Sequence, residues 1–199
     1  MLYTFSCKLL RVIYKLLFRF EVKGLENIPK DSGVLLCSNH ISNLDPPAMG
    51  IWIDRQIRFM AKQELFDIPL LGRLIKALGA FPVKRGGVSK ESIRTSFQLL
   101  KDGGVMAIFP EGTRNMDGAV EAKKGAAMIA LRSGAAVVPV AICGQYKLFR
   151  KMKVVYGPPV DLSDLVELKG GEVLEQATER IMSHINEMLR AEMAPTTSR

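Results

Sequence analysis

Two short segments of the chain combine residue types that suit acid–base chemistry on an anionic substrate. The first, Asn39-His40-Ile41-Ser42-Asn43-Leu44-Asp45, follows an apolar run of strand length and sets an imidazole and a carboxylate five positions apart. A neutral imidazole with a reference pKa of about 6.5 can take a proton from an alcohol when another group fixes its tautomer. We therefore predict that His40 is a general base and Asp45 its orienting carboxylate, with no protein nucleophile required. A competing interpretation is that Asp45 caps the following helix and His40 is an ordinary hydrogen-bonded turn residue.

The second segment, Phe109-Pro110-Glu111-Gly112-Thr113-Arg114, also follows an apolar run of strand length. Gly112 allows a ligand to approach the backbone closely, and the planar guanidinium of Arg114 suits a phosphate group. The alternative is a surface turn with an incidental salt bridge. Because reactive groups gather beyond the carboxyl ends of the strands in an α/β sheet, we expect both segments to lie at one edge.

Two further basic stretches are weaker indications of an anion site. Lys84-Arg85-Gly86-Gly87 follows another expected strand and combines cations with flexible backbone. Lys123-Lys124-Gly125 opens an expected helix, where cations oppose the helix dipole. Each stretch has an alternative, namely a solvated loop for the first and a solubilising patch for the second.

The pattern of apolar residues predicts an alternation of strands and helices. We expect strands near residues 21–29, 33–38, 57–62, 79–85, 105–109, 136–142 and 153–156, and helices at 1–20, 45–52, 69–78, 89–101, 123–132 and 171–192. Several strands are apolar throughout, which is typical of a sheet covered on both faces. The fold class is therefore α/β, a single domain with a mixed, largely parallel central sheet. We expect this domain to span residues 21–194, with residues 195–199 as a frayed tail.

Composition narrows the choice of partner. The net charge of +8 at pH 7 implies an anionic partner, which could be a nucleic acid, an acidic membrane surface or an acidic substrate. A nucleic acid is not expected, because the chain has no recognisable binding motif. The three cysteines, Cys7, Cys37 and Cys143, are too far apart to suggest a metal site and read as free thiols. We therefore expect no metal.

Residues 1–20 have the pattern of a helix that lies on a membrane. Their cations, Lys8, Arg11, Lys15 and Arg19, fall within an arc of roughly 80° on a helix, and no acidic residue accompanies them. A leucine-rich side is expected opposite: Leu9, Leu10, Ile13, Leu16, Leu17 and Phe20. A spanning helix needs about 20 nearly uncharged residues, so we expect the helix to lie in the plane of an anionic bilayer. The alternative is an ordinary amphipathic helix packed on its own core.

The order of the motifs is more specific than any one of them. N-H-x-x-x-x-D, then A-K-x-E-L-F with I-P-L-L-G, G-A-F-P-V-K-R, F-P-E-G-T-R and V-V-P-V resembles the glycerolipid acyltransferase family. Within that family it resembles the bacterial 1-acyl-glycerol-3-phosphate acyltransferases. The resemblance covers roughly residues 20–160. It implies His40 as general base, Asp45 as its orienter, and acceptor or phosphate binding by the following residues: Lys62, Arg85, Glu111, Gly112, Thr113 and Arg114.

The resemblance also implies an activity. The enzyme would transfer an acyl chain from acyl-CoA or acyl-acyl-carrier protein, as co-substrate and without a cofactor, to the sn-2 hydroxyl of lysophosphatidic acid. It would work at the cytoplasmic face of the cell membrane. Two other classes remain open from the residues, a thioesterase that activates water with His40 and a non-catalytic lipid-binding module.

Overall fold

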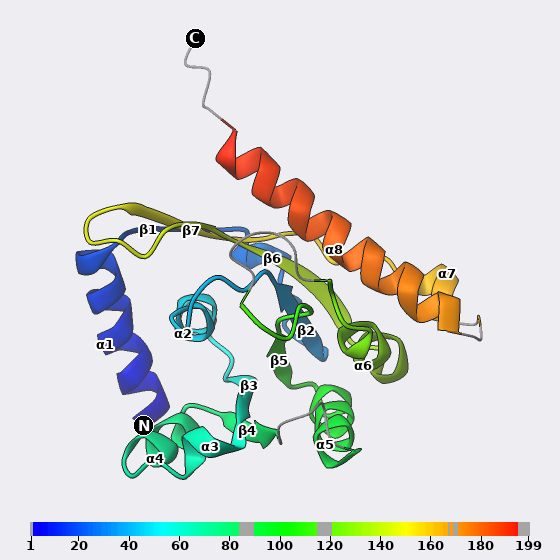
Figure 1. The fold of residues 1–199 in the computed structure, drawn as a ribbon, viewed down its shortest axis with the longest axis horizontal. Coiled ribbons are helices and arrows are strands. Elements are labelled where there is room, and N and C mark those ends of the chain that lie inside the picture. Colours follow the sequence, from blue (N-terminus) through cyan, green and yellow to red (C-terminus); the bar gives the residue numbers. More distant parts are fainter. Residues whose placement is uncertain (1, 84–89, 115–120, 167, 169–170, 195–199) are drawn as a thin grey trace.

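The fold, seen here in a computed structural model that describes residues 2–83, 90–114, 121–166, 168 and 171–194, is built on one seven-stranded sheet (Figure 1). The strand order is β1-β7-β6-β2-β5-β3-β4. The strands are β1 (Arg19–Lys23), β2 (Val34–Ser38), β3 (Ile57–Lys62), β4 (Ala80–Val83), β5 (Val105–Ile108), β6 (Ala136–Gly144) and β7 (Lys151–Tyr156). Every strand forms within or next to a run expected from the sequence.

Five neighbouring strands run parallel, and this direction decides where their carboxyl ends meet. Parallel pairing joins β6, β2, β5, β3 and β4 in that order. β7 pairs with β6 in the antiparallel direction, and β1 pairs in parallel with β7. Helical crossovers return the chain after most of the parallel strands, as parallel pairing requires. The prediction of a mixed, largely parallel sheet in a single α/β domain is confirmed.

Helices cover both faces of the sheet and seal two apolar layers. The helices are α1 (Leu2–Leu17), α2 (Asp45–Gly50), α3 (Gln63–Phe66), α4 (Leu71–Ala77), α5 (Lys90–Lys101), α6 (Gly125–Ser133), α7 (Ser163–Val166) and α8 (Gly171–Met193), with the 3-10 turn η1 (Leu25–Asn27). Side chains from α1 and α2 pack on one face, and side chains from α5, α6 and α8 pack on the other. β2 is buried along its whole length because both faces are covered.

The first helix differs from the sequence prediction in length and in packing. It ends at Leu17, and Arg19 and Phe20, which we expected in the helix, belong to β1. Cys7, Tyr14 and Phe18 are buried in the core, so one face of α1 is an integral part of the domain. The outer face still exposes apolar side chains, among them Leu9 and Leu16. The alternative of a helix packed on its own core is confirmed for the inner face, and the membrane interpretation stays a prediction for the outer face. The short helices α3 and α7 were not predicted.

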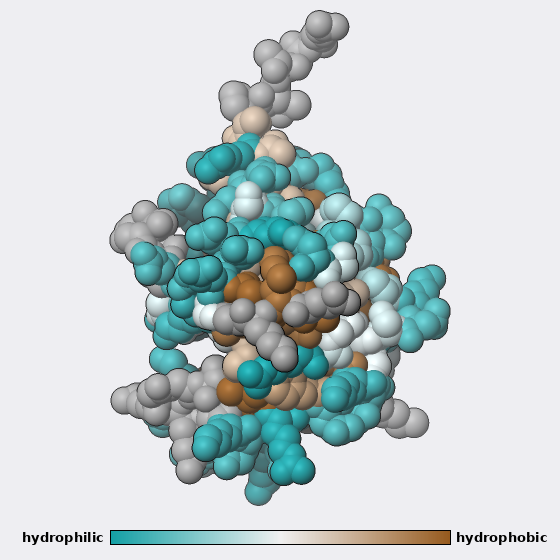
Figure 2. Space-filling model, turned by 90° about the vertical axis from the view of Figure 1, so that its right-hand side faces the viewer, coloured by the Kyte–Doolittle hydropathy of each residue, from teal (hydrophilic) through white to brown (hydrophobic). Residues whose placement is uncertain are grey.

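Figure 2 shows the molecule from the side opposite α1, where hydrophilic residues surround a small central apolar area. Among the helices that the structure describes, none is long and apolar enough to cross a bilayer.

Candidate active site

His40 and Asp45 are in direct contact just beyond the carboxyl end of β2. The imidazole Nδ1 lies 2.8 Å from Asp45 Oδ2, in a side-chain pair where His40 is 16% exposed and Asp45 is fully buried. With its proton on Nδ1, the ring donates to the carboxylate and keeps a lone pair on Nε2. This tautomer is the one that can accept a proton from a substrate hydroxyl. The geometry that the spacing predicted is present.

The carboxylate of Asp45 organises the whole turn before α2. Its Oδ2 also accepts hydrogen bonds from the backbone amides of Ile41 and Ser42, each at 2.6 Å. The competing prediction that Asp45 caps the helix is wrong, because Leu44 occupies the cap position and the Asp45 side chain turns back toward His40. A charged acceptor shared by two backbone donors strongly resists rotation. The orientation of the imidazole is therefore set by a rigid turn.

Glu111 and Phe109 bring the second segment onto the first. The Glu111 carboxylate is buried and accepts a hydrogen bond from the backbone amide of His40 at 3.1 Å. The ring of Phe109 stacks on the imidazole, with centroids 4.0 Å apart and an interplanar angle of 17°. β5 neighbours β2 in the sheet, so the segments that follow them are adjacent in space. The expectation of a shared edge is confirmed, and Phe109 is a contact that the sequence analysis missed.

Asn39 is a second residue whose contacts the sequence analysis did not predict. Its side-chain amide donates to the Ile142 carbonyl at 3.0 Å, and its side-chain oxygen accepts from the Ile142 amide at 2.8 Å. The side chain thus continues the pairing of β2 with β6 for one more residue. It fixes the point at which the chain leaves the sheet toward His40. The only indication in the sequence was its place in the first segment.

The first helix is hydrogen-bonded to the segment that carries Asp45. The Tyr14 hydroxyl donates to the Leu44 carbonyl at 2.9 Å, and the Arg11 guanidinium donates to the Ile51 carbonyl at 2.5 Å. Burial raises the pKa of Tyr14, and the charge of Asp45 raises it further, so the phenol remains a donor at neutral pH. α1 therefore supports α2 and its preceding turn.

The second oxygen of Asp45 retains acceptor capacity. Asp45 Oδ1 and the Tyr146 hydroxyl are both buried, and among the described residues neither has a hydrogen-bond partner. Burial raises the pKa of Tyr146, and the charge of Asp45 raises it further, so the phenol stays protonated. A buried carboxylate oxygen and a buried hydroxyl thus lie close together on the inner side of the dyad.

Those of the remaining predicted residues that the structure describes lie at the same edge of the sheet, and their binding roles remain predictions. Gly112, Thr113 and Arg114 are exposed directly after the buried Glu111. Lys62 is the exposed last residue of β3, two strands from β2 in the sheet. Arg85, with Lys84, Gly86 and Gly87, lies outside the described residues.

The two lysines before α6 have separate surroundings. The Lys123 amide donates to the Pro110 carbonyl at 2.8 Å, and the Lys123 side chain passes over Gly112, which has a φ of +66°. Lys124 instead forms an ion pair with Glu175 on α8. Lys124 is thus neutralised within the protein, whereas Lys123 lies beside the candidate site.

The arrangement suits proton transfer by a side chain. Within the described parts of the chain, no three histidine, cysteine or acidic side chains gather in a group that could hold a metal ion. The groups that do gather are the His40 imidazole and the Asp45 carboxylate, with the exposed Arg114 at the same edge of the sheet.

Comparisons with known proteins agree with this geometry. A family model described as "Acyltransferase" matches residues 19–143, a range that includes His40, Asp45 and Glu111. The 1-acyl-sn-glycerol-3-phosphate acyltransferase of Bacillus subtilis is 37% identical over 193 residues, which cover 94% of this chain and 96% of that protein. The protein of the same name from Borreliella burgdorferi is 32% identical over 133 residues, covering 65% of this chain and 53% of its own.

A solved structure has the same architecture. The crystal structure of the 1-acyl-sn-glycerophosphate acyltransferase PlsC from Thermotoga maritima superposes with a TM-score of 0.75 at 28% sequence identity. The match covers 94% of this chain and 78% of that one. A family match over more than half of the chain, a relative similar over nearly its full length and a shared fold lead to one conclusion: this chain belongs to the acyltransferase family.

Proposed function

We propose that this protein is a 1-acyl-sn-glycerol-3-phosphate acyltransferase, which converts lysophosphatidic acid and an acyl thioester into phosphatidic acid and a free thiol. The observation that carries the proposal is the His40–Asp45 pair, oriented by three hydrogen bonds to one carboxylate oxygen and joined to Glu111. The relatives named above carry the same activity in their names. Phosphatidic acid is a phospholipid precursor, so the reaction belongs to phospholipid biosynthesis.

The chemistry is acyl transfer by general base catalysis. His40 Nε2 accepts the proton of the sn-2 hydroxyl while the hydroxyl oxygen attacks the thioester carbonyl carbon. An ester C–O bond forms, the C–S bond breaks, and the leaving thiolate takes the proton from the imidazolium. Buried Asp45 stabilises the imidazolium while it carries that proton.

The acceptor phosphate would be held by basic residues at the same edge of the sheet. Arg114 follows Glu111 and its guanidinium is exposed, so it can form the paired hydrogen bonds that a phosphate accepts. The motif resemblance adds Arg85 and Lys62 to this group. The acyl donor is acyl-CoA or acyl-acyl-carrier protein, and both present the same thioester to His40.

We propose further that the enzyme works on the surface of an anionic membrane, at its cytoplasmic face. Both the acceptor and the product are lipids, and the outer face of α1 combines apolar side chains with the exposed cations Lys8 and Lys15. This location would let the enzyme take its acceptor without extracting the lipid into water.

The direct test uses purified protein, lysophosphatidic acid and each of the two thioesters. We expect phosphatidic acid and free thiol to appear in equal amounts, measured by mass spectrometry and a thiol reagent. Omitting lysophosphatidic acid should abolish most thiol release. Thiol released without phosphatidic acid would identify a thioesterase instead, and the absence of both products with both donors would refute the proposal.

A further inference from the structure

Most of the large apolar side chains that the described residues expose belong to three segments. The first is the outer face of α1, with Phe5, Leu9, Val12 and Leu16. The second is the α3–α4 turn, where Leu70 is 78% exposed, and the third is the β6–β7 loop, where Phe149 is 69% exposed. Exposed apolar surface on this scale marks an interaction site.

The three segments lie along one side of the molecule (Figure 1). The Phe149 amide donates to the Leu17 carbonyl at 2.7 Å, which joins the β6–β7 loop to the end of α1. At the other end of α1, the Tyr3 hydroxyl accepts from the Ile57 amide, and the neighbouring Gln56 donates to the Ala77 carbonyl of α4. α1 thus bridges the two other segments.

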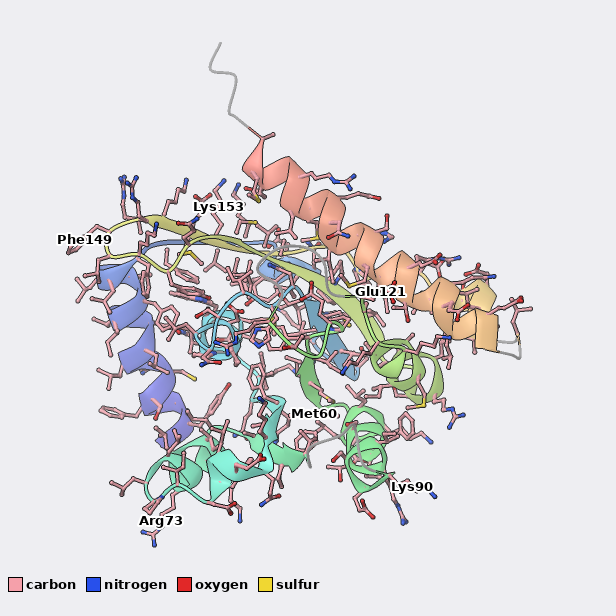
Figure 3. The ribbon with its side chains drawn as sticks, viewed as in Figure 1. Met60, Arg73, Lys90, Glu121, Phe149 and Lys153 are labelled. Carbon is pink, nitrogen blue, oxygen red and sulfur yellow. The ribbon has the colours of Figure 1, made fainter. Side chains whose placement is uncertain are left out.

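The backbone holds the two projecting tips in a conformation that side chains disfavour. Among the described residues other than glycine, Leu70 and Phe149 are those with positive φ, at 65° and 61°. Such conformations persist where the surroundings enforce them, and they are common at functional sites. Figure 3 shows the Phe149 side chain at the outer end of its loop, pointing away from the domain. Exposing these two apolar side chains to water does not stabilise the fold.

Cations flank the apolar tips. The exposed ones are Lys8 and Lys15 on α1, Arg73 and Lys76 on α4, and Lys147 and Arg150 around the β6–β7 tip. α1 and residues 145–151 contain no acidic residue, and the α3–α4 segment carries only Glu64 and Asp67. An apolar strip bordered by cations is complementary to a bilayer with anionic headgroups above its acyl chains.

We propose that the Leu148–Phe149 tip and the Leu70 turn insert into an anionic phospholipid bilayer together with the outer face of α1. This inference deepens the proposed function, on which it rests for the presence of a lipid acceptor. Inserting the two tips near opposite ends of α1 would hold the domain in one orientation on the membrane. A single surface helix would let the domain rotate about the helix axis. A second copy of the chain is a less suitable occupant, because a symmetric dimer would bring the two cationic borders together.

Tryptophan scanning locates the contact without reference to activity. Phe149→Trp and Leu70→Trp in the full chain are mixed with phosphatidylglycerol–phosphatidylcholine vesicles that contain brominated acyl chains. Val166→Trp is the matched control, because Val166 is 58% exposed but lies on α7, across the molecule from α1. We expect bromine quenching above the Trp52 background at positions 149 and 70, and none at 166. Vesicle-bound protein with no added quenching at 149 and 70 would overturn the inference.

The second test measures how strongly the protein binds to the same vesicles. Leu148→Ser with Phe149→Ser should lower the vesicle partition coefficient by tenfold or more, on the order of the loss of one large apolar side chain from lipid. The control pair, Val166→Ser with Leu168→Ser, has similar exposed fractions. It should change the partition coefficient by less than about twofold, because α7 lies across the molecule from α1. Equal binding of both pairs would overturn the inference, as would a tip-dependent dimer mass in light scattering without lipid.

The test of membrane insertion and the test of the proposed function can fail independently of each other. Phosphatidic acid formation from detergent-dispersed lysophosphatidic acid should be the same for the serine pair and the unaltered protein. If the unaltered protein makes no phosphatidic acid, the proposed function fails, while the quenching and partition results still decide the docking surface.

Discussion

The Tyr14 hydroxyl donates a hydrogen bond of 2.9 Å to the Leu44 carbonyl, and so ties the N-terminal helix to the residue before Asp45. α1 therefore has two roles: its outer face exposes apolar side chains, and its inner face supports the turn between His40 and Asp45. Removing α1 would take Cys7 and Tyr14 out of the core and uncover the residues they pack against, so it could not test membrane binding alone. Substitutions on its outer face are the appropriate test.

Tyr14→Phe should lower both stability and turnover. The lost hydrogen bond should reduce the free energy of unfolding by about 1 kcal/mol, and the loosened turn should reduce kcat several-fold. Urea unfolding and steady-state kinetics measure the two effects. Tyr3→Phe is the matched control, because it removes the contact of another α1 hydroxyl with Ile57, away from the turn. A kcat loss of the same size in both variants would contradict a specific link to Asp45.

His40→Ala should lower kcat by about 10²–10⁴-fold, the usual range for the loss of a general base. Asp45→Asn should lose much of the same rate, because a neutral amide no longer stabilises the imidazolium. The chain contains only one other histidine, so His184→Ala is the control. His184 Nδ1 pairs with the Arg180 carbonyl within α8, and its loss should leave kcat unchanged. Turnover near the unaltered level in folded His40→Ala would end the assignment.

Glu111→Gln and Glu111→Ala should differ, because the glutamine oxygen can still accept from the His40 amide. We expect Glu111→Gln to retain most of the turnover. Glu111→Ala should lose at least about tenfold, since small displacements of a catalytic group are costly. Steady-state kinetics, with circular dichroism as a folding check, make the comparison. Equal losses in the two variants would show that the charge of Glu111 matters more than its hydrogen bond to His40.

Arg114→Ala should raise the KM for lysophosphatidic acid by about tenfold or more, as expected for the loss of charge-assisted hydrogen bonds to a phosphate. The KM for the thioester should change little. Arg132→Ala removes the same charge from the last turn of α6, just before β6 starts at the opposite edge of the sheet, and serves as the control. A parallel rise in both KM values would instead indicate a structural role for Arg114.

Acid should weaken the attachment of α8 to the sheet. Hydrogen bonding to Lys153, and then to Lys23, lowers the pKa of Glu192 below its ordinary value of 4.5. The resulting stability is present above about pH 4.5 and is lost as the pH falls through the lower pKa of the folded state. Glu192→Gln should therefore cost up to about 1 kcal/mol of unfolding free energy at pH 7 and progressively less below pH 4.5. Urea unfolding at several pH values measures this, and a cost independent of pH would contradict the ion-pair explanation.

The sequence was sufficient wherever a local pattern decides the structure. Short apolar runs bounded by turn residues, such as Val34–Ser38, are typical of strands in a covered sheet, and glycines after 101 and 133 end their helices where expected. The His40–Asp45 contact was predictable for the same reason, because five residues of turn limit how far the two side chains can separate. The motif order added the family resemblance, which the comparisons confirm.

Which helix faces enter the core and which distant residues meet depend on the packing of the whole domain. The helical pattern of residues 1–20 contains two apolar faces, and the sequence could not say that Tyr14 enters the core while Leu16 remains outside. The stacking of Phe109 on His40 and the pairing of Asn39 with Ile142 depend on strand order, which no local pattern encodes. Local propensity acts over a few residues, whereas these contacts join positions about 70 and 100 residues apart through the packing of the whole sheet.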